Sequence, residues 1–309
     1  MTDLSNFQPI PDAILRSLAQ PIAPNSPTSG ADVIGLIPAG GRATRLSPLP
    51  MSKELYPIGF QHLPEGLRPK VVGQYLLERM RSAGIRKLFW IVRSDKWDIP
   101  AYFGNGSQLG LDLGYLILGV PFGVPYTLDQ AYPFVSQARI ALGFPDILFS
   151  PPEMFQQLLS HQTKTGADVV LALVPAKAGQ VGGRVGFDAI GRVQQILEKP
   201  EQTDLAHIWC AAVWAPSFTQ FLHEQVAPVL CAYASTGAMP ERELPIGDVI
   251  QRAIAAGLHV QAMPFPDGEF LDVGIAENLA QAVQYFAAQV SGVEVAAEVL
   301  GKEGQPFQF

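Results

Sequence analysis

Short apolar runs alternate with amphipathic segments along most of the chain. The first run, 32–37, has the length of a strand and leads directly into a pair of glycines. In residues 71–83 apolar side chains recur at helical spacing up to Gly84, and residues 88–92 are apolar again. This order predicts a βαβ unit, whose crossover implies parallel strands covered by helices on both faces.

The same rhythm continues towards the end of the chain. Further strands are expected at 113–118, 147–149, 169–174, 193–197 and 259–263. Further helices are expected at 153–165, 217–226, 246–256 and 276–289. The pattern therefore predicts a protein of the α/β class.

The first 31 residues differ from the rest. Five prolines bracket one short segment with apolar side chains on one helical face, and residues 21–30 are turn-forming. We therefore expect an N-terminal arm over 1–31, consisting of a short helix and a proline-rich linker. A single domain is expected over 32–309.

Composition narrows the choice of partners and compartment. Hydrophobic residues make up 48% of the chain, and the net charge is −7. These values predict a sizeable core and argue against a nucleic-acid partner bound through a basic surface. The N-terminus lacks the basic and apolar stretches of a secretory signal, and the apolar runs are too short to span a bilayer. We expect a cytoplasmic protein with no membrane partner, in which Cys210 and Cys231 are buried, reduced thiols.

The glycines after the first strand carry the clearest chemistry. Gly40 and Gly41 stand where ligands bind in open α/β sheets, and they let backbone N–H groups approach phosphate oxygens. Arg45 and Lys53 follow and can reach the same phosphates. The segment is neither a Walker loop nor a dinucleotide fingerprint, because the required lysine and glycine spacings are absent. It predicts a nucleotide site.

Several sequence motifs occur along the chain in an order that indicates a family for this site. Residues 40–48 read Gly-Gly-x-x-Thr-Arg-Leu-x-Pro, and residues 52–57 read Ser-Lys-x-Leu-x-Pro. Further matching segments lie at 103–115, 128–131, 198–200 and 270–274. Over residues 33–285 the chain resembles the sugar-1-phosphate nucleotidylyltransferases, most closely the glucose-1-phosphate thymidylyl- and uridylyltransferases. The segment 128–131 occupies the place of that family's Gly-Leu-Ala-Gln-Ala helix start.

The resemblance implies a fold and a reaction. The fold is a three-layer α/β/α sandwich with a mixed, mainly parallel central sheet, as in nucleotide-diphospho-sugar transferases. In the reaction, an oxygen of a hexose 1-phosphate attacks the α-phosphorus of a nucleoside triphosphate (NTP), and pyrophosphate leaves. Positioning and charge neutralisation supply most of such catalysis. The family also implies a homo-oligomer.

By the same resemblance, particular residues take particular roles. Arg45 and Lys53 would bind the triphosphate and stabilise the departing pyrophosphate. The implied nucleotide-binding residues are Ala39, Gly40, Gly41, Arg42, Thr44 and Gln130.

The other substrate and the metal have their own implied ligands. Lys199 would hold the sugar phosphate in line as a third catalytic residue, with Glu198 and Gly186 binding the sugar phosphate beside it. Asp146 and Asp272 would be the two carboxylates that bind Mg²⁺. Asp146 also fits a simple turn, because Gly, Phe and Pro precede it.

Two departures from the family pattern leave alternatives open. Ala43 replaces a glycine, which matters only if the position needs a positive φ. Residues 118–127 lack the glutamine that reads the pyrimidine, so UTP or dTTP is expected from overall similarity alone. A catalytically degenerate member that binds a nucleotide or nucleotide-sugar is the alternative. A related glycosyltransferase ranks last, because no Asp-x-Asp motif occurs.

Overall fold

A computed structural model describes residues 32–291 except 65, 121, 178 and 238–241. The predicted arm, residues 1–31, lies outside the described residues. The strands are β1 (Val33–Ala39), β2 (Pro57–Leu63), β3 (Gly66–Val71), β4 (Lys87–Val92), β5 (Asp112–Ile117), β6 (Arg139–Leu142), β7 (Ile147–Ser150), β8 (Val169–Pro175), β9 (Gly183–Phe187), β10 (Val193–Glu198), β11 (His207–Trp214), β12 (Val260–Pro264) and β13 (Glu269–Asp272).

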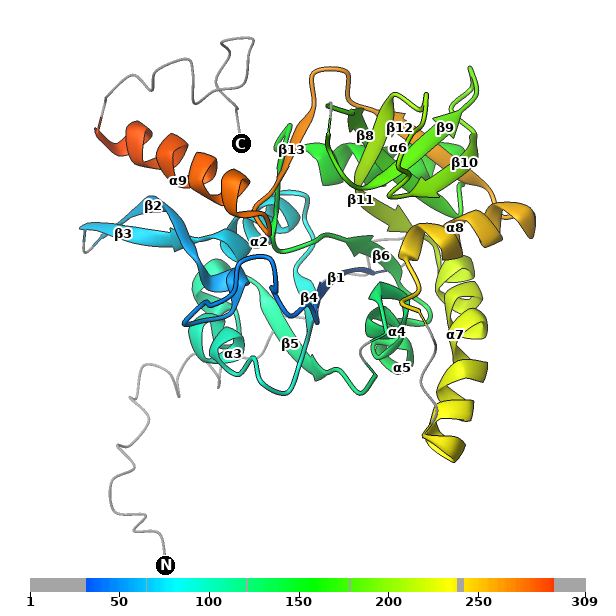
Figure 1. The fold of residues 1–309 in the computed structure, drawn as a ribbon, viewed down its shortest axis with the longest axis horizontal. Coiled ribbons are helices and arrows are strands. Elements are labelled where there is room, and N and C mark those ends of the chain that lie inside the picture. Colours follow the sequence, from blue (N-terminus) through cyan, green and yellow to red (C-terminus); the bar gives the residue numbers. More distant parts are fainter. Residues whose placement is uncertain (1–31, 65, 121, 178, 238–241, 292–309) are drawn as a thin grey trace, which may run out of the picture. The chain divides into compact units, whose positions relative to one another are not determined.

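Helices lie between several of these strands (Figure 1). The α-helices are α2 (Val72–Ser82), α3 (Asp98–Phe103), α4 (Val124–Asp129), α5 (Tyr132–Val135), α6 (Met154–Thr165), α7 (Pro216–Thr236), α8 (Ile246–Ala255) and α9 (Ala276–Ser291), and the 3₁₀ turns are η2 (Lys53–Leu55) and η3 (Ser107–Leu109). None of the helices in the described part of the chain is both long and apolar enough to cross a membrane.

The central sheet has the order β10-β9-β11-β6-β1-β4-β5, and β8 joins it by pairing with β11 and β12. β6, β1, β4 and β5 are mutually parallel. β11 runs antiparallel to β6, β8 and β9, and β10 runs antiparallel to β9. The sheet is therefore mixed, and most of its strands point the same way, as predicted.

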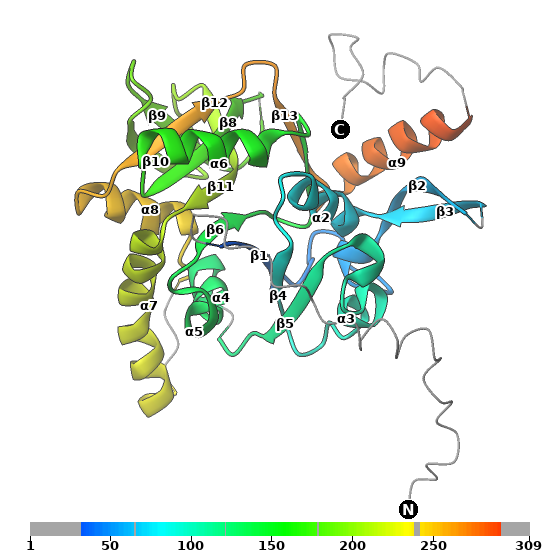
Figure 2. The same ribbon diagram turned by 180° about the vertical axis from the view of Figure 1, so that it is seen from behind.

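Successive side chains of the buried strands point to opposite faces of the sheet, and this explains why helices cover both faces. In β8, Val169, Leu171 and Leu173 face one core cluster, whereas Val170 and its alternate neighbours face the other. Helices α4, α5, α7 and α8 contribute to the first cluster, and α2, α3 and α6 contribute to the second (Figures 1 and 2). The three layers of the predicted sandwich are present.

The sequence pattern missed the strand in the middle of this sheet. β11 is half-buried at its first residue and buried over the rest of its length, and it pairs with β6, β8 and β9. β8 is equally buried, but its run is rich in valine and leucine, whereas β11 has Cys-Ala-Ala at its centre, so its own strand signal is weaker and tertiary pairing decides its conformation.

Helix α7 also differs from the prediction. It runs to Thr236 rather than ending at residue 226, and it contains Pro228. Its last turns are largely exposed, so Cys231 is an exposed thiol, and the prediction that it is buried was wrong. Cys210 is buried, and burial raises the pKa of its thiol to about 12. The described helix ends at Gly237, which adopts the left-handed conformation.

Two small sheets complete the domain and shape the site. β2 and β3 form a hairpin against which α9 packs (Figure 1). β7 pairs antiparallel with β13, so residue 147 lies opposite Asp272. This second pairing joins two segments that are far apart in the sequence.

Candidate active site

The glycine turn follows β1 at the carboxyl edge of the parallel strands. Ala39 is buried and pairs with Val92 at the end of β4, and Gly40 comes next. A Cβ atom on Gly40 would lie 2.8 Å from the side chain of Leu118. It would also lie 3.5 Å from the Thr127 hydroxyl oxygen. The close approach of the neighbouring side chain explains the glycine here.

The rest of the turn is open to solvent. Gly41, Arg42 and Thr44 are exposed. A Cβ atom on Gly41 would lie 3.8 Å from Nζ of Lys53, so the lysine reaches back to the glycine pair. The turn closes with a hydrogen bond in which the Leu46 amide donates to the Ala43 carbonyl, at 3.0 Å. Backbone amides and cations are thus available together to an anionic ligand.

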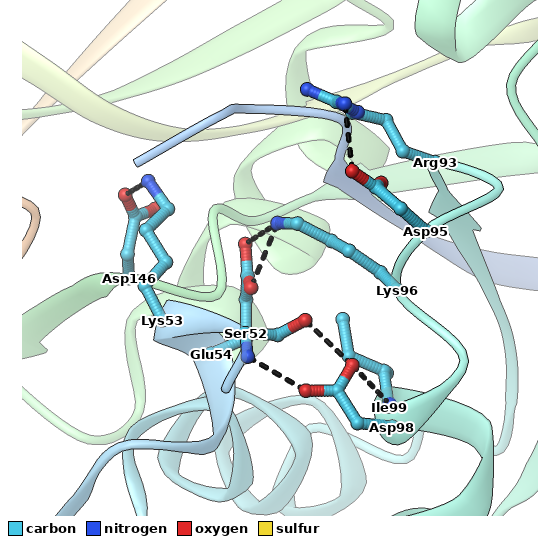
Figure 3. A network of polar contacts seen from close by, with 9 residues as sticks. All are labelled: Ser52, Lys53, Glu54, Arg93, Asp95, Lys96, Asp98, Ile99 and Asp146. Atoms are coloured by element: carbon cyan, nitrogen blue, oxygen red, sulfur yellow. Dashed lines mark hydrogen bonds and ion pairs between the residues drawn. The ribbon is translucent and has the colours of Figure 1, made fainter. Parts of the chain in front are cut away.

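Four charged side chains meet beside this turn. Lys53 pairs with Asp146 (Figure 3). Arg45 pairs with Asp272, with 3.4 Å between guanidinium nitrogen and carboxylate oxygen. A Cβ atom on Gly274 would lie 2.8 Å from an oxygen of Asp272 and 3.2 Å from one of Asp146. It would lie 3.3 Å from Arg45. The two ion pairs therefore surround one small space, which the absence of a side chain at residue 274 keeps open.

The pairing of β7 with β13 brings the two carboxylates together. Asp146 directly precedes β7, and Asp272 ends β13. The Val273 amide donates to the Asp146 carbonyl at 2.9 Å, and the Gly274 amide donates to the Asp272 carboxylate at 2.8 Å. These hydrogen bonds fix both the backbone and one carboxylate of the cluster.

The charge of Lys53 is secured by its neighbours. Burial by itself would lower the pKa of Lys53, but the carboxylates of Asp146 and then Glu54 outweigh this effect and raise it. The ammonium therefore stays protonated across the neutral range. A protonated lysine beside a glycine turn is suited to binding phosphate oxygens.

The same two carboxylates fit a magnesium ion. Mg²⁺ prefers oxygen ligands and usually keeps waters and substrate phosphates beside one or two protein carboxylates. Asp146 and Asp272 both have an oxygen close to Gly274. Among the described residues, no group of three or more His, Cys, Asp or Glu side chains could hold a metal ion. The two carboxylates would therefore supply only part of a magnesium coordination shell, with waters and substrate phosphates as the other ligands.

A second group of predicted residues lies around the end of β10. Glu198 is the last residue of β10, and Lys199 follows it with φ 46°. A Cβ atom on Gly247, near the start of α8, would lie 2.7 Å from the Glu198 carboxyl carbon. A Cβ atom on Gly183 would lie 2.9 Å from a Glu198 oxygen. Glycines on two sides thus leave room for this carboxyl group.

On β9, Gly183 is the glycine that adjoins Glu198, and the predicted sugar-phosphate residue Gly186 lies further along the strand. The two glycines are three residues apart on β9, so they face opposite sides of the strand. A Cβ atom on Gly186 would lie 3.0 Å from Leu205. Strand register, which the sequence does not show, decides which glycine is next to the carboxylate.

Burial sets the charge state of Glu198. Desolvation raises the pKa of Glu198 above its ordinary value, and the Asp248 carboxylate raises it further. The Trp209 indole and then the Lys199 ammonium act in the opposite direction without cancelling the shift. Trp209 comes from β11, so the pairing of that strand brings the indole to Glu198.

Trp209 also connects the two groups. Its ring lies against that of Phe144, with 5.8 Å between centroids. Phe144 precedes Asp146 by two residues, in the segment between β6 and β7. The carboxylate cluster and the Glu198 group are therefore joined through one aromatic contact.

Comparison with known proteins shows the family to which the chain belongs. The profile of the nucleotidyl transferase family matches residues 34–289. The chain belongs to the nucleotidyl transferase family. It is 26% identical over 255 residues to the low-salt glycan biosynthesis nucleotidyltransferase Agl11 of Haloferax volcanii, covering 81% of this chain and 65% of that protein. It is 29% identical over 172 residues to a glucose-1-phosphate thymidylyltransferase of Mycolicibacterium smegmatis, covering 54% of this chain and 55% of that protein. The matches span less than two thirds of these two relatives' own lengths.

Solved structures agree on the fold. A UDP-glucose pyrophosphorylase from Acinetobacter baumanii superimposes with a TM-score of 0.66 at 16% identity, over 84% of this chain and 94% of that one. A UDP-glucose pyrophosphorylase complexed with UDP-glucose gives 0.66 at 19% identity, over 84% and 99% of the two chains. At such identities the likeness shows the nucleotide-diphospho-sugar transferase fold alone.

One expected helix start differs from the structure. The helix start expected at 128–131 is wrong, because α4 already begins at Val124. Gly123 adopts φ 120°, and a proline in the first turn favours the helix from there. Gln130 is the C-cap of this helix, and its Oε1 lies 3.6 Å from where a Cβ atom on Gly119 would be. Thr127, which the sequence pattern did not single out, is the helix residue that faces Gly40.

The nucleotidyl transferase turn also contains a backbone irregularity. Ala43, which stands where the family resemblance has glycine, adopts φ 52°. The left-handed region costs a residue with a Cβ atom about 1 kcal/mol or more. The turn therefore retains the conformation that glycine would favour, at some cost in stability.

The opposite edge of the sheet has a different character. A hollow of about 950 Å³ lies at the amino ends of β1, β4 and β5, and its lining includes Asp32, Lys87 and Phe134. None of the predicted site residues lines it. The glycine turn and the four charged side chains beside it lie instead near the carboxyl edge, where ligands bind in open α/β sheets.

Proposed function

We propose that the protein transfers a nucleotidyl group from a nucleoside triphosphate to a sugar 1-phosphate, giving a nucleoside diphosphate sugar and pyrophosphate. The observation that carries this proposal is the meeting of Arg45, Lys53, Asp146 and Asp272 around Gly274, beside the glycine turn. Two cations and two carboxylates in one space match a metal-bound polyphosphate better than a neutral ligand. Family membership and the names of the relatives support the same reaction.

The reaction joins two anions. An oxygen of the sugar phosphate forms a bond to the α-phosphorus, and the bond from that phosphorus to the oxygen bridging to the β-phosphate breaks. Lys53 and Arg45 would neutralise the triphosphate and the pyrophosphate that takes the electron pair of the broken bond. Backbone amides around Gly40 and Gly41, with Arg42, Thr44 and Ala39 beside them, would fix the nucleotide.

Magnesium fits this scheme as the cofactor. Asp146 and Asp272 would hold it, and when bound it supplies positive charge to the phosphate oxygens. Both carboxylates are now paired with cations, so loading the site would release Lys53 and Arg45 to the phosphates. The two carboxylates would thus bind the metal, and the two cations would bind the triphosphate.

The Glu198 group would bind the sugar phosphate. Lys199 would hold its phosphate in line with the α-phosphorus, and the half-buried Glu198 carboxylate would accept hydrogen bonds from sugar hydroxyls. The base is proposed to be a pyrimidine, with UTP or dTTP as donor, on the basis of the relatives' names. Gln130, beside Gly119 at the end of β5, is the side chain proposed to contact it. A hexose 1-phosphate, a homo-oligomer and a cytoplasmic location stay predictions of the sequence.

A pyrophosphate-release screen tests the reaction. Several NTPs are crossed with common hexose 1-phosphates, each with and without Mg²⁺. We expect turnover with UTP or dTTP and one or more hexose 1-phosphates, dependent on the metal. Absence of pyrophosphate release over the whole panel would rule out the proposed activity.

The conformation of Ala43 is the reason for considering one alternative function. A nucleotide-binding member without turnover would tolerate a strained turn, since it needs binding but not alignment for transfer. It predicts that nucleotides raise the melting temperature although no pyrophosphate is released. Turnover that disappears in Asp272→Asn would exclude this second function.

A further inference from the structure

Ser52, the residue before Lys53, is hydrogen-bonded to the segment that follows β4. The Ser52 amide donates to one oxygen of Asp98, and the Ser52 hydroxyl donates to the other, both at 2.6 Å (Figure 3). Asp98 is the first residue of α3, and its carboxylate also accepts the Ile99 amide at 3.1 Å. The carboxylate is therefore held by its own helix backbone as well as by Ser52.

The residue after Lys53 is held by the same segment. The Lys96 ammonium donates to both carboxylate oxygens of Glu54, at 2.8 and 2.9 Å. The Glu54 side chain is 1% exposed and that of Lys96 is 9% exposed. A buried ion pair gains little net stability over an apolar pair of similar volume, because both charges are desolvated. Stability alone therefore does not explain this ion pair, which stands directly beside the predicted catalytic lysine.

Lys53 itself points away from these two anchors. Figure 3 shows its side chain directed to Asp146, while Glu54 turns towards Lys96. Lys53 begins a 3₁₀ turn of three residues, which is too short to hold its own direction. The two neighbouring residues fix the backbone, and the lysine side chain is left to reach the glycine turn.

We propose that Lys96 and Asp98 are positioning residues for nucleotidyl transfer, because together they hold the backbone on both sides of Lys53. This inference rests on the proposed function, since it takes Lys53 as the cation that binds the triphosphate. Neither residue would touch the substrate. Their effect would pass entirely through the position of the Lys53 ammonium.

A double-mutant cycle separates positioning from general stability. Asp98→Asn, Lys53→Met and the double variant are compared for kcat, for KM of the NTP, and for binding of UTP and dTTP with Mg²⁺. A misplaced catalytic group costs up to about 100-fold, so we expect Asp98→Asn to lower kcat about 10-fold. On the Lys53→Met background the same change should have no further effect, because the residue it positions is gone. An equal loss in both backgrounds would overturn the proposal.

Lys96 is tested without leaving a buried charge unpaired. Lys96→Met alone would strand Glu54, so it is combined with Glu54→Leu. We expect this apolar pair to fold, with a melting temperature near the wild-type value, and to lose kcat about 10-fold. If the variant that combines Lys96→Met with Glu54→Leu folds and keeps the wild-type kcat, the proposed role of Lys96 is wrong. Asp95→Asn, which breaks the neighbouring pair with Arg93, is the matched control and should leave kcat unchanged.

The binding measurements distinguish the two possible failures. If the wild type turns over but the cycle is additive, the positioning role is wrong and the proposed function stands. If the wild type binds nucleotides without turnover, the proposed function fails, and the same cycle in dissociation constants decides the positioning role. If no NTP of the panel binds or turns over, both are wrong.

Discussion

The two ends of the site are built on different principles. At the end proposed to bind the triphosphate, Lys53 and Arg45 stand outside the strands and α-helices and are paired with carboxylates. At the sugar end, Glu198 ends a regular strand and lies in a space left by glycines. Carboxylates raise the pKa of Lys53, whereas desolvation is the first cause of the raised pKa of Glu198.

The contrast corresponds to the ligands proposed for each end. A triphosphate with its metal carries strong charge, which can exchange directly with the ion pairs of this end of the site. A sugar offers neutral hydroxyl groups, which a half-buried carboxylate can orient through hydrogen bonds. The triphosphate end should therefore control the rate, and the sugar end should control substrate affinity.

The largest effect is expected from Lys53→Met. Removal of its charge takes away stabilisation of the departing pyrophosphate, and we expect kcat/KM to fall by about 100- to 1,000-fold. Steady-state pyrophosphate release measures the loss. Lys87→Met, which breaks an exposed pair with Asp32 at the opposite edge, is the control and should keep wild-type activity. A comparable loss in both variants would contradict a specific role for Lys53.

Asp272→Asn should have the next largest effect. It removes one of two carboxylates proposed to hold Mg²⁺, so activity should fall by about 10- to 100-fold, with a higher Mg²⁺ concentration needed for half-maximal rate. A magnesium titration of the rate provides the measurement. Asp112→Asn, at the start of β5, serves as the matched control. An unchanged magnesium requirement would remove Asp272 from the proposed metal site.

Glu198→Gln tests the sugar end by its effect on affinity. The amide keeps one acceptor but loses the charge, so we expect KM for the sugar phosphate to rise about 10-fold while KM for the NTP is unchanged. Initial rates with each substrate varied in turn measure both constants. Glu78→Gln is the control, because Glu78 pairs with Lys70 away from this group. A change confined to KM of the NTP would break the division between the two ends.

The same variant has a pH signature in stability. The folded protein raises the pKa of Glu198 above its unfolded value near 4.5. The contribution of Glu198 to stability is thus fully present below that pH and is lost as pH rises through the folded pKa. Thermal unfolding from acidic to neutral pH should show wild type losing stability relative to Glu198→Gln. A difference in stability between the two proteins that stays constant with pH would mean that burial does not shift the pKa of Glu198.

The smallest effect is expected from Ala43→Gly. Glycine relieves the positive φ, so the free energy of unfolding should rise by up to about 1 kcal/mol, as measured by denaturant titration. Ala101→Gly, within α3, should shift stability in the opposite direction because it loses helix propensity. Destabilisation by both substitutions would show that Ala43 is not strained.

The sequence determined much of this protein by local pattern and motif. Apolar runs and helical periodicity predicted β4, α2, α6 and α8 closely, because each element carries its own signal. The motifs around Gly40, Lys53, Glu198 and Asp272 predicted the family, since neighbouring residues define each one. The fold followed from that membership.

Tertiary structure decided the rest. Only the pairing of β7 with β13 places Asp146 beside Asp272, and only strand register puts Gly183 rather than Gly186 next to Glu198. β11 has only a weak strand signal of its own, so the neighbouring strands set its place and bring Trp209 to the site. Long-range pairing is a property of the whole chain, because its free energy comes from contacts that no local segment contains.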